Sequence, residues 1–198
     1  MLTGAGFLAL WQGGIRLGGA MAGPMLVDAG LDLEAIVWLR GVGGMVVGLA
    51  AAVLGTLAVR RFGKLRVLIL AGVLMVAALA GLIWWSLRPG PVPVLATLQI
   101  LLMSATAMSF VAFYAAMMDW CAPQKAATDF ALLQSLDAAL AVATGILAGQ
   151  MAEAWGYAPV FAMAGLLLLA AFPLARVRLE RNAVSASPPN LSVSETPT

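Results

Sequence analysis

Arg16 stands within a long uncharged run of residues. It shares one helical face with Gln12, Gly19 and Gly23, because these residues are spaced at four, three and four. A guanidinium stays charged at any accessible pH, so in an apolar setting it needs an anion. Two anions fit equally well: the acidic part of a bound solute, or Asp137 in a structural ion pair.

Asp137 lies in a second apolar run, with Gln134 one turn before it and Thr144 two turns after it. A carboxylate in this setting either takes up and releases a proton or stays ionised beside Arg16 or Arg40. Arg40 stands only a few residues inside its own run. Its long side chain can therefore reach the polar boundary, which makes it the weaker candidate.

A stripe of polar and aromatic side chains follows residues 93–117 at heptad-like spacing. Its members are Gln99, Met103, Thr106, Phe110, Phe113 and Tyr114. Such a stripe forms either the wall of a site for a bulky, partly aromatic solute or a packing surface between helices. Gln99, Thr106 and Tyr114 are the candidates for solute contact.

The composition excludes several classes of protein. Hydrophobic residues make up 63% of the 198 positions and charged residues only 10%, whereas a soluble domain has about 25% charged residues. With no His and only one Cys, the chain has no imidazole metal site, no Ser-His-Asp triad and no CxxC motif. A net charge of +2 is too small for a nucleic-acid-binding protein. We expect a membrane protein that is not an enzyme, with no catalytic residue, metal site or cofactor.

Six apolar runs are long enough to cross a bilayer, since a crossing helix needs about 20 apolar residues. They are residues 2–27, 35–59, 65–87, 93–117, 128–152 and 159–175. The connections between them are too short for a soluble domain. We expect an all-α six-helix transmembrane bundle over residues 1–176. The Ser-, Pro- and Thr-containing segment 177–198 is expected to be a disordered cytoplasmic tail.

Basic residues indicate the orientation of the bundle. One side holds Arg60, Arg61, Lys64, Arg66, Lys125, Arg176, Arg178 and Arg181, and the other side holds Arg88 alone. Because basic loops stay in the cytoplasm, both termini are expected there. Tryptophans near the ends of the runs fit interfacial positions, namely Trp38, Trp84, Trp85, Trp120 and Trp155. No basic residue precedes Arg16, so the sequence reads as one that begins in mid-protein.

Polar residues are unevenly distributed among the six runs. Residues 65–87 and 159–175 carry no acidic or amide side chain, so we expect these helices to face lipid over most of their surface. The other four runs are expected to line a polar cavity. They also contain pairs spaced for close helix packing, namely Gly14/Gly18, Gly19/Gly23, Gly44/Gly48 and Gly145/Gly149.

Two segments at the ends of the second and fifth runs resemble each other. Gly55-Thr-Leu-Ala58 precedes Phe62-Gly63, and Gly149-Gln-Met-Ala152 precedes Trp155-Gly156. Because the two copies fall on opposite sides of the membrane, they suggest a three-helix unit repeated in inverted orientation.

The whole pattern resembles the C-terminal half of a major facilitator superfamily transporter. The segment GTLAVRRFGKLR, residues 55–66, is similar to the signature that follows the second helix of each half, with Arg60 where an acidic residue is usual. The resemblance implies a fold with a 3+3 inverted repeat that works by alternating access. It also implies a gating loop, to which we assign Arg60, Arg61, Gly63 and Asp129.

Two shorter segments are similar to siderophore importers of the rhizobactin and pyochelin type, with muropeptide permeases and acetyl-CoA transporters as relatives. They are GGAMAGP at residues 18–24, followed by LVDAGL at 26–31, and ATDFALLQS at 127–135. The resemblance implies proton-driven uptake of a ferric siderophore or similar bulky anionic solute across the bacterial inner membrane.

Superfamily members usually have two halves, so the resemblance also implies a missing N-terminal half or a homodimer partner. Three alternatives stay open. The chain transports a muropeptide or drug-like solute, it is a non-transporting membrane scaffold, or it is a truncated inactive fragment.

Overall fold

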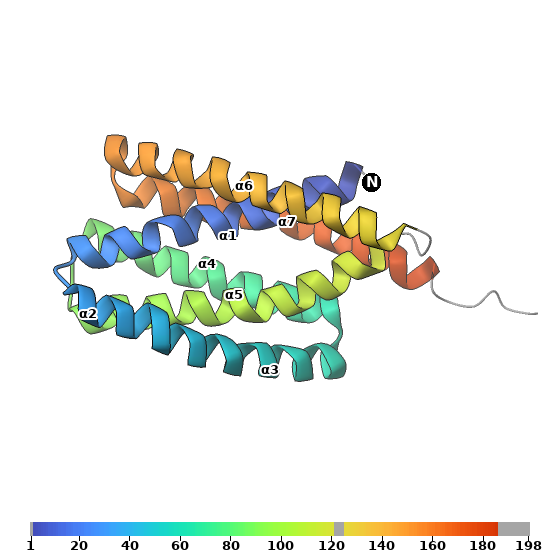
Figure 1. The fold of residues 1–198 in the computed structure, drawn as a ribbon, viewed down its shortest axis with the longest axis horizontal. Helices are drawn as coiled ribbons and strands as arrows, with labels where there is room; N and C mark the ends of the chain where they lie inside the picture. The colour runs from blue at the N-terminus through green and yellow to red at the C-terminus, as the bar shows by residue number, and fades with distance from the viewer. Residues whose placement is uncertain (1, 121–124, 186–198) are drawn as a thin grey trace, which may run out of the picture.

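The computed structural model describes residues 2–120 and 125–185, and all the regular structure in these ranges is helical (Figure 1). The elements are α1 (Leu2–Asp28), α2 (Leu33–Ile36), the π-helical segment η1 (Val37–Gly43), α3 (Gly44–Phe62), α4 (Lys64–Leu87), α5 (Val92–Trp120), α6 (Ala126–Trp155) and α7 (Tyr157–Ser185). α2, η1 and α3 follow one another without a break. The described chain therefore forms six long helical rods.

The rods coincide with the six expected runs, with ends that differ by a few residues. Five of them are long and apolar enough to span a membrane. The exception in the described residues is α1, where Gln12, Arg16 and several glycines lower the mean hydropathy. The expected tail needs correction at its start, because α7 continues past Arg176 to Ser185. The rest of that tail, 186–198, lies outside the described residues.

Two glycines each join consecutive rods through a one-residue turn. Gly63, with φ of 85°, separates α3 from α4, and Gly156, with φ of 80°, separates α6 from α7. A positive φ is costly for residues that carry a Cβ, so glycine is the natural residue at both turns. The backbone N–H of each also bonds to the carbonyl four residues earlier, Val59 or Ala152. These matching turns lie at opposite ends of the bundle (Figure 1), as an inverted repeat requires.

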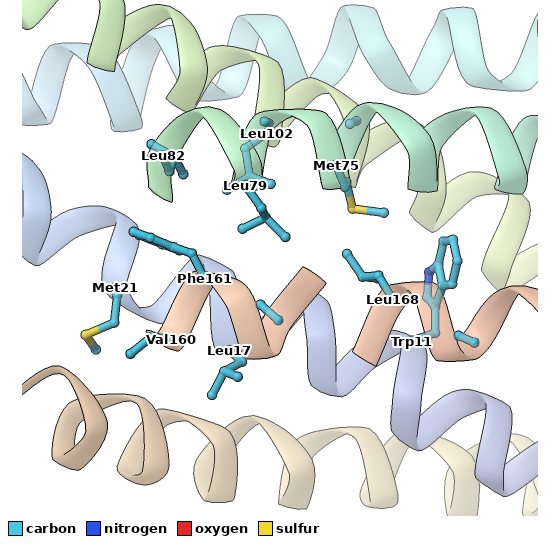
Figure 2. Close-up of a cluster of buried hydrophobic side chains, with 14 of the residues drawn as sticks. Trp11, Leu17, Met21, Met75, Leu79, Leu82, Leu102, Val160, Phe161 and Leu168 are labelled. Atoms are coloured by element: carbon cyan, nitrogen blue, oxygen red, sulfur yellow. The ribbon is translucent and has the colours of Figure 1, made fainter. Parts of the chain in front are cut away.

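The hydrophobic core lies where α4 and α7 pack against each other and against α1 (Figure 2). Trp11 of α1, Met75 and Leu79 of α4, and Phe161 and Leu168 of α7 are all at most 2% exposed. Leu102 adds a contribution from α5. Burial of large apolar side chains therefore unites the first helix with the two that have the fewest polar residues.

This core corrects the expectation that residues 65–87 and 159–175 face lipid over most of their surface. The buried share of the most apolar stretch is 44% in α4 and 28% in α7, whereas it is 6% for Leu33–Phe62 and 11% for α6. α4 and α7 keep only narrow exposed strips, which include Leu70, Val73 and Leu166. A helix that is apolar on every side can be buried against several neighbouring helices, and this is how α4 and α7 pack.

The glycine pairs also divide into two groups. A Cβ on Gly14 would lie 2.8 Å from Leu168 Cγ, and one on Gly18 would lie 3.0 Å from Leu79 Cδ2, so both sit in close helix contacts. In contrast, Gly19, Gly48, Gly145 and Gly149 have no neighbour within 4 Å of such a Cβ among the described residues. Gly23 and Gly44 also lie in close contacts, because a Cβ on them would meet the side chains of Arg40 and Met103. Close packing is therefore confirmed for the Gly14/Gly18 pair and for one member of each of the pairs Gly19/Gly23 and Gly44/Gly48, and it is wrong for the other four glycines.

We expect Gly14→Ala to lower the free energy of unfolding by about 1–3 kcal/mol, because the new methyl group would also lie 2.9 Å from the Ala164 carbonyl oxygen. The matched control Gly19→Ala adds the same methyl group to open space. It should be neutral or stabilising by up to about 1 kcal/mol, since alanine is the better helix former. Thermal unfolding in detergent measures the stability of both variants. Equal unfolding midpoints for Gly14→Ala and Gly19→Ala would contradict the close packing of α1 against α7.

Candidate functional site

A cavity of about 530 Å³ lies among the rods that carry the polar residues. Residues of α1, η1, α3, α5 and α6 line it, and the described part of α4 and α7 contributes none of the lining. This agrees with the expectation that the first, second, fourth and fifth helices surround a polar space. Gly19, Gly44 and Gly48 are among its walls, so glycines help to make room for the cavity.

Arg16 and Asp137 meet beside this cavity. Nη2 of Arg16 donates a hydrogen bond of 2.7 Å to Oδ2 of Asp137, which joins α1 to α6. The Asp137 side chain is only 7% exposed, whereas that of Arg16 is 34% exposed and lines the cavity. The pair thus has a buried anion and an accessible cation.

The other polar atoms around this pair have no hydrogen-bond partner among the described residues. They are Oδ1 of Asp137, Nε of Arg16, Oε1 of Gln134 and both amide atoms of Gln12. α1 and α6 run in the same direction (Figure 1), so Gln12 and Gln134, each about one turn before its charged neighbour, lie at a similar level. A buried polar atom without a partner costs about 1–3 kcal/mol. At this level α1 and α6 therefore carry buried polar atoms with capacity for further hydrogen bonds.

Arg40 lies on η1 and also lines the cavity, so its side chain is directed inward and not to the helix end. A Cβ on Gly23 would lie 2.4 Å from its Nη1 atom, which places the guanidinium against the backbone of α1. No carboxylate of the described residues pairs with it. π-helical segments are frequent at functional sites, and this one carries the second cation of the cavity.

The cavity therefore has more positive than negative charge. Arg16 and Arg40 line it, and Asp137 neutralises only one of them. Phe110 adds an aromatic wall, with its ring centre 6.0 Å from Cζ of Arg16. An anion with apolar or aromatic parts suits this lining better than a cation or a sugar does.

The stripe on α5 is only partly in the cavity. Gln99 and Thr106 line it, but Nε2 of Gln99 donates to the Ala22 carbonyl at 3.0 Å, and Thr106 Oγ1 lies 3.7 Å from the sulfur of Met75. Tyr114 is not among the lining residues and instead packs with Phe110 and Phe113 at 5.7 and 5.9 Å between ring centres. Gln99 thus holds α1 and α5 together.

The proposed gating residues lie away from the cavity, at one end of the bundle. Arg60 and Arg61 are exposed in the last turn of α3, Gly63 forms the turn, and Asp129 lies in the first turn of α6. Lys64, next to Gly63, donates to the Ala115 carbonyl at 3.3 Å and so ties this turn to α5. The loops that carry basic residues meet at this end, and the α4–α5 connection with Arg88 lies at the opposite end (Figure 1).

Sequence reasoning missed two features of the bundle interior. It treated Gly44 and Gly48 only as packing residues, although both also line the cavity. It also gave no role to Trp11, whose Nε1 donates to Ser109 Oγ at 3.2 Å in the interior. Ser109 was visible as a hydroxyl in an apolar run, but nothing in the sequence marked Trp11 as its partner.

Comparison with known protein families finds a match to the family model described as Major Facilitator Superfamily, over residues 2–195 of the chain.

A double-mutant cycle measures how strongly Arg16 and Asp137 depend on each other. Arg16→Met leaves the buried carboxylate without its cation and should cost up to about 3–5 kcal/mol. Asp137→Ala should cost less, because Arg16 can turn toward the open cavity. The double variant should be more stable than the sum of the single effects predicts, by about 0.5–3 kcal/mol. If the loss of unfolding free energy in the double variant equals the sum of the losses in the two single variants, Arg16 and Asp137 do not stabilise each other.

Proposed function

The chain belongs to the Major Facilitator Superfamily, whose members are secondary transporters and not enzymes, and from that premise we propose that it transports a bulky anionic solute. The observation that carries the proposal is the cavity lined by two guanidinium groups, of which only one is paired with a carboxylate. A volume of about 530 Å³ suits a solute of drug-like size or larger, since ligand sites commonly measure about 300–1,000 Å³. Arg40, which has no carboxylate partner in the described chain, is the first contact for such an anion.

We place a ferric siderophore first among the solutes. Its support is the resemblance of residues 18–31 and 127–135 to siderophore importers, together with the excess of positive charge in the cavity. In this proposal the chain works in the bacterial inner membrane with both termini in the cytoplasm. Muropeptides and drug-like solutes are the competing cargoes, and uptake assays separate them.

Proton coupling follows from competition for Arg16. A bound anion attracts the accessible guanidinium away from Asp137, and a buried carboxylate that loses its counter-ion is costly unless it takes up a proton. Release of the solute on the other side returns Arg16 to Asp137 and expels the proton. Gln12 and Gln134 lie about one turn before Arg16 and Asp137 and have buried amide atoms without partners in the described residues, so they supply hydrogen bonds to the rearranged groups.

A second six-helix bundle completes this transporter in our proposal, either as the other half of a longer protein or as a second copy. The support is the exposed apolar surface of α3 and α6, the two least buried spans, which includes Leu49, Leu57, Val142 and Ile146. Both helices also border the cavity. Alternating access then consists of rocking the two bundles about the shared cavity.

A membrane scaffold without transport is the alternative from another class. It requires the charges inside the bundle to pair only with one another and to leave no open cavity. Arg40 lies in a cavity without a carboxylate partner in the described residues, so this observation favours transport.

Uptake of labelled ferric siderophore by cells that carry the gene, in its natural context, tests the solute. Arg40→Gln should lower uptake at subsaturating concentration by about tenfold or more, because a charge-assisted hydrogen bond to the solute is lost. The matched control Arg66→Gln removes a cation of the exposed α3–α4 turn and should retain uptake at equal protein abundance. Full uptake by Arg40→Gln would contradict the proposed contact between Arg40 and the solute. Uptake of muropeptide in preference to siderophore would contradict the proposed cargo.

Asp137→Asn tests the coupling. Exchange of solute between equal concentrations inside and outside the vesicle needs no net proton movement, so it should continue in the variant. Accumulation of solute driven by a pH gradient should fall in the variant to the level measured without a pH gradient. Both are measured in proteoliposomes with the complete transporter. If Asp137→Asn still accumulates solute against its gradient, Asp137 does not carry the proton.

A further inference from the structure

A second pocket, of about 500 Å³, lies at the end of the bundle opposite the basic loops. Residues from the ends of α1, α4 and α6, from the α4–α5 connection and from the beginnings of α5 and α7 line it. It has no residue in common with the central cavity. It is therefore a separate site that the transport proposal does not use.

The pocket is suited to positive charge. Asp28 is the one charged residue among its lining residues in the described chain. Three helices end at it, with Asp28, Leu87 and Trp155 as last residues, and two begin at it. Helix C-termini carry partial negative charge and helix N-termini carry partial positive charge. With three C-termini and two N-termini, the helix ends together place a net negative partial charge at the pocket.

Aromatic rings form much of the remaining wall. Trp155, 71% exposed, and Tyr157 stand at the junction of α6 and α7, and Trp85 stands near the end of α4. The hydroxyl of Tyr157 donates to Oδ2 of Asp28, which holds the carboxylate at the pocket. Faces of Trp and Tyr attract ammonium groups.

Trp85 contributes a hydrogen-bond donor that is still free. Its side chain is buried, with the residue only 7% exposed, and its Nε1 atom has no acceptor in the described structure. A Cβ on Gly90, another residue of the pocket wall, would lie 3.8 Å from this atom. Trp85 lines the pocket, and its unused N–H is buried close to the wall at Gly90. A ligand that brings an acceptor oxygen to this wall as well as a cation to Asp28 would use both groups.

We propose that this pocket binds the headgroup of an aminophospholipid. The ammonium group lies between the Asp28 carboxylate and the rings of Trp155 and Tyr157, and the Trp85 N–H donates to an oxygen of the neighbouring phosphate. A lipid fits better than a free amine because the pocket lies at the ends of apolar helices, where exposed tryptophans occupy the membrane interface. Met25, Leu87 and Val92 give it apolar walls for the upper part of the lipid chains.

Lipid titration of the 198-residue chain in detergent tests the proposal. Short-chain phosphatidylethanolamine should change the tryptophan fluorescence saturably, with a Kd about tenfold or more below that of phosphatidylglycerol of equal chain length, which has no ammonium group. Free ethanolamine supplies the cation without phosphate or chains and should bind more weakly still. Equal binding of the two lipids would overturn the proposal, and binding of ethanolamine as tight as that of the lipid would assign the site to a free amine.

Three variants assign the contacts. Asp28→Asn keeps an acceptor for Tyr157 but removes the charge, and Trp85→Phe keeps a ring but removes the donor; each should weaken phosphatidylethanolamine binding by about fivefold or more. Trp84→Phe is the matched control, since Trp84 is 56% exposed and does not line the pocket. If Trp84→Phe weakens binding as much as Trp85→Phe does, the pocket is not the site. The lipid preference of the unsubstituted chain remains decisive if a variant fails to fold.

Discussion

The pairing of a buried carboxylate with a guanidinium group inside an apolar bundle is the constraint on which this architecture depends. The Asp137 side chain is only 7% exposed, and burial of an unpaired charge is far more costly than burial of a neutral group. α1 meets this need by placing the Arg16 guanidinium, which cannot lose its charge, at 2.7 Å from the carboxylate of α6. The pair links α1 to α6, and its open side defines one wall of the cavity. The position of one cation thus determines both a helix contact and the site.

Apolar packing supplies the rigidity that such a pair requires. In a bilayer, lipid chains are as apolar as leucine, so helix association depends on close van der Waals contact and not on removal of apolar surface from water. α4 and α7 provide that contact with α1 through Phe161, Leu79 and the approach at Gly14. Since α4 and α7 need no polar surface, they can pack with α1 in the interior, while α3 and α6 remain at the periphery and border the cavity together with α1 and α5.

The sequence was sufficient for the number, order and approximate bounds of the rods, because long apolar runs and glycine turns are local signals. It also indicated which helices surround the cavity, since ionisable residues inside a bundle avoid lipid. It was insufficient for side-chain partners. Arg16 had two equally good anions in the sequence, and only the proximity of α1 and α6 selects Asp137. In the same way, Gly14 and Gly19 both belong to glycine pairs with the same spacing in α1. They differ only in whether another helix lies close to them, which the sequence does not show.

The unpartnered polar atoms explain why a bundle that could be more stable contains Gln12 and Gln134. Each such atom costs free energy in the resting arrangement, and leucine at either position would avoid that cost. A site in which every group were satisfied would hold Arg16 on Asp137 and resist any exchange of partners. Amide groups with unused hydrogen bonds lower the cost of the exchanged state relative to the paired state, because they can serve whichever charged group is left alone. In the proposed transport cycle, this property allows one cation to serve two anions in turn.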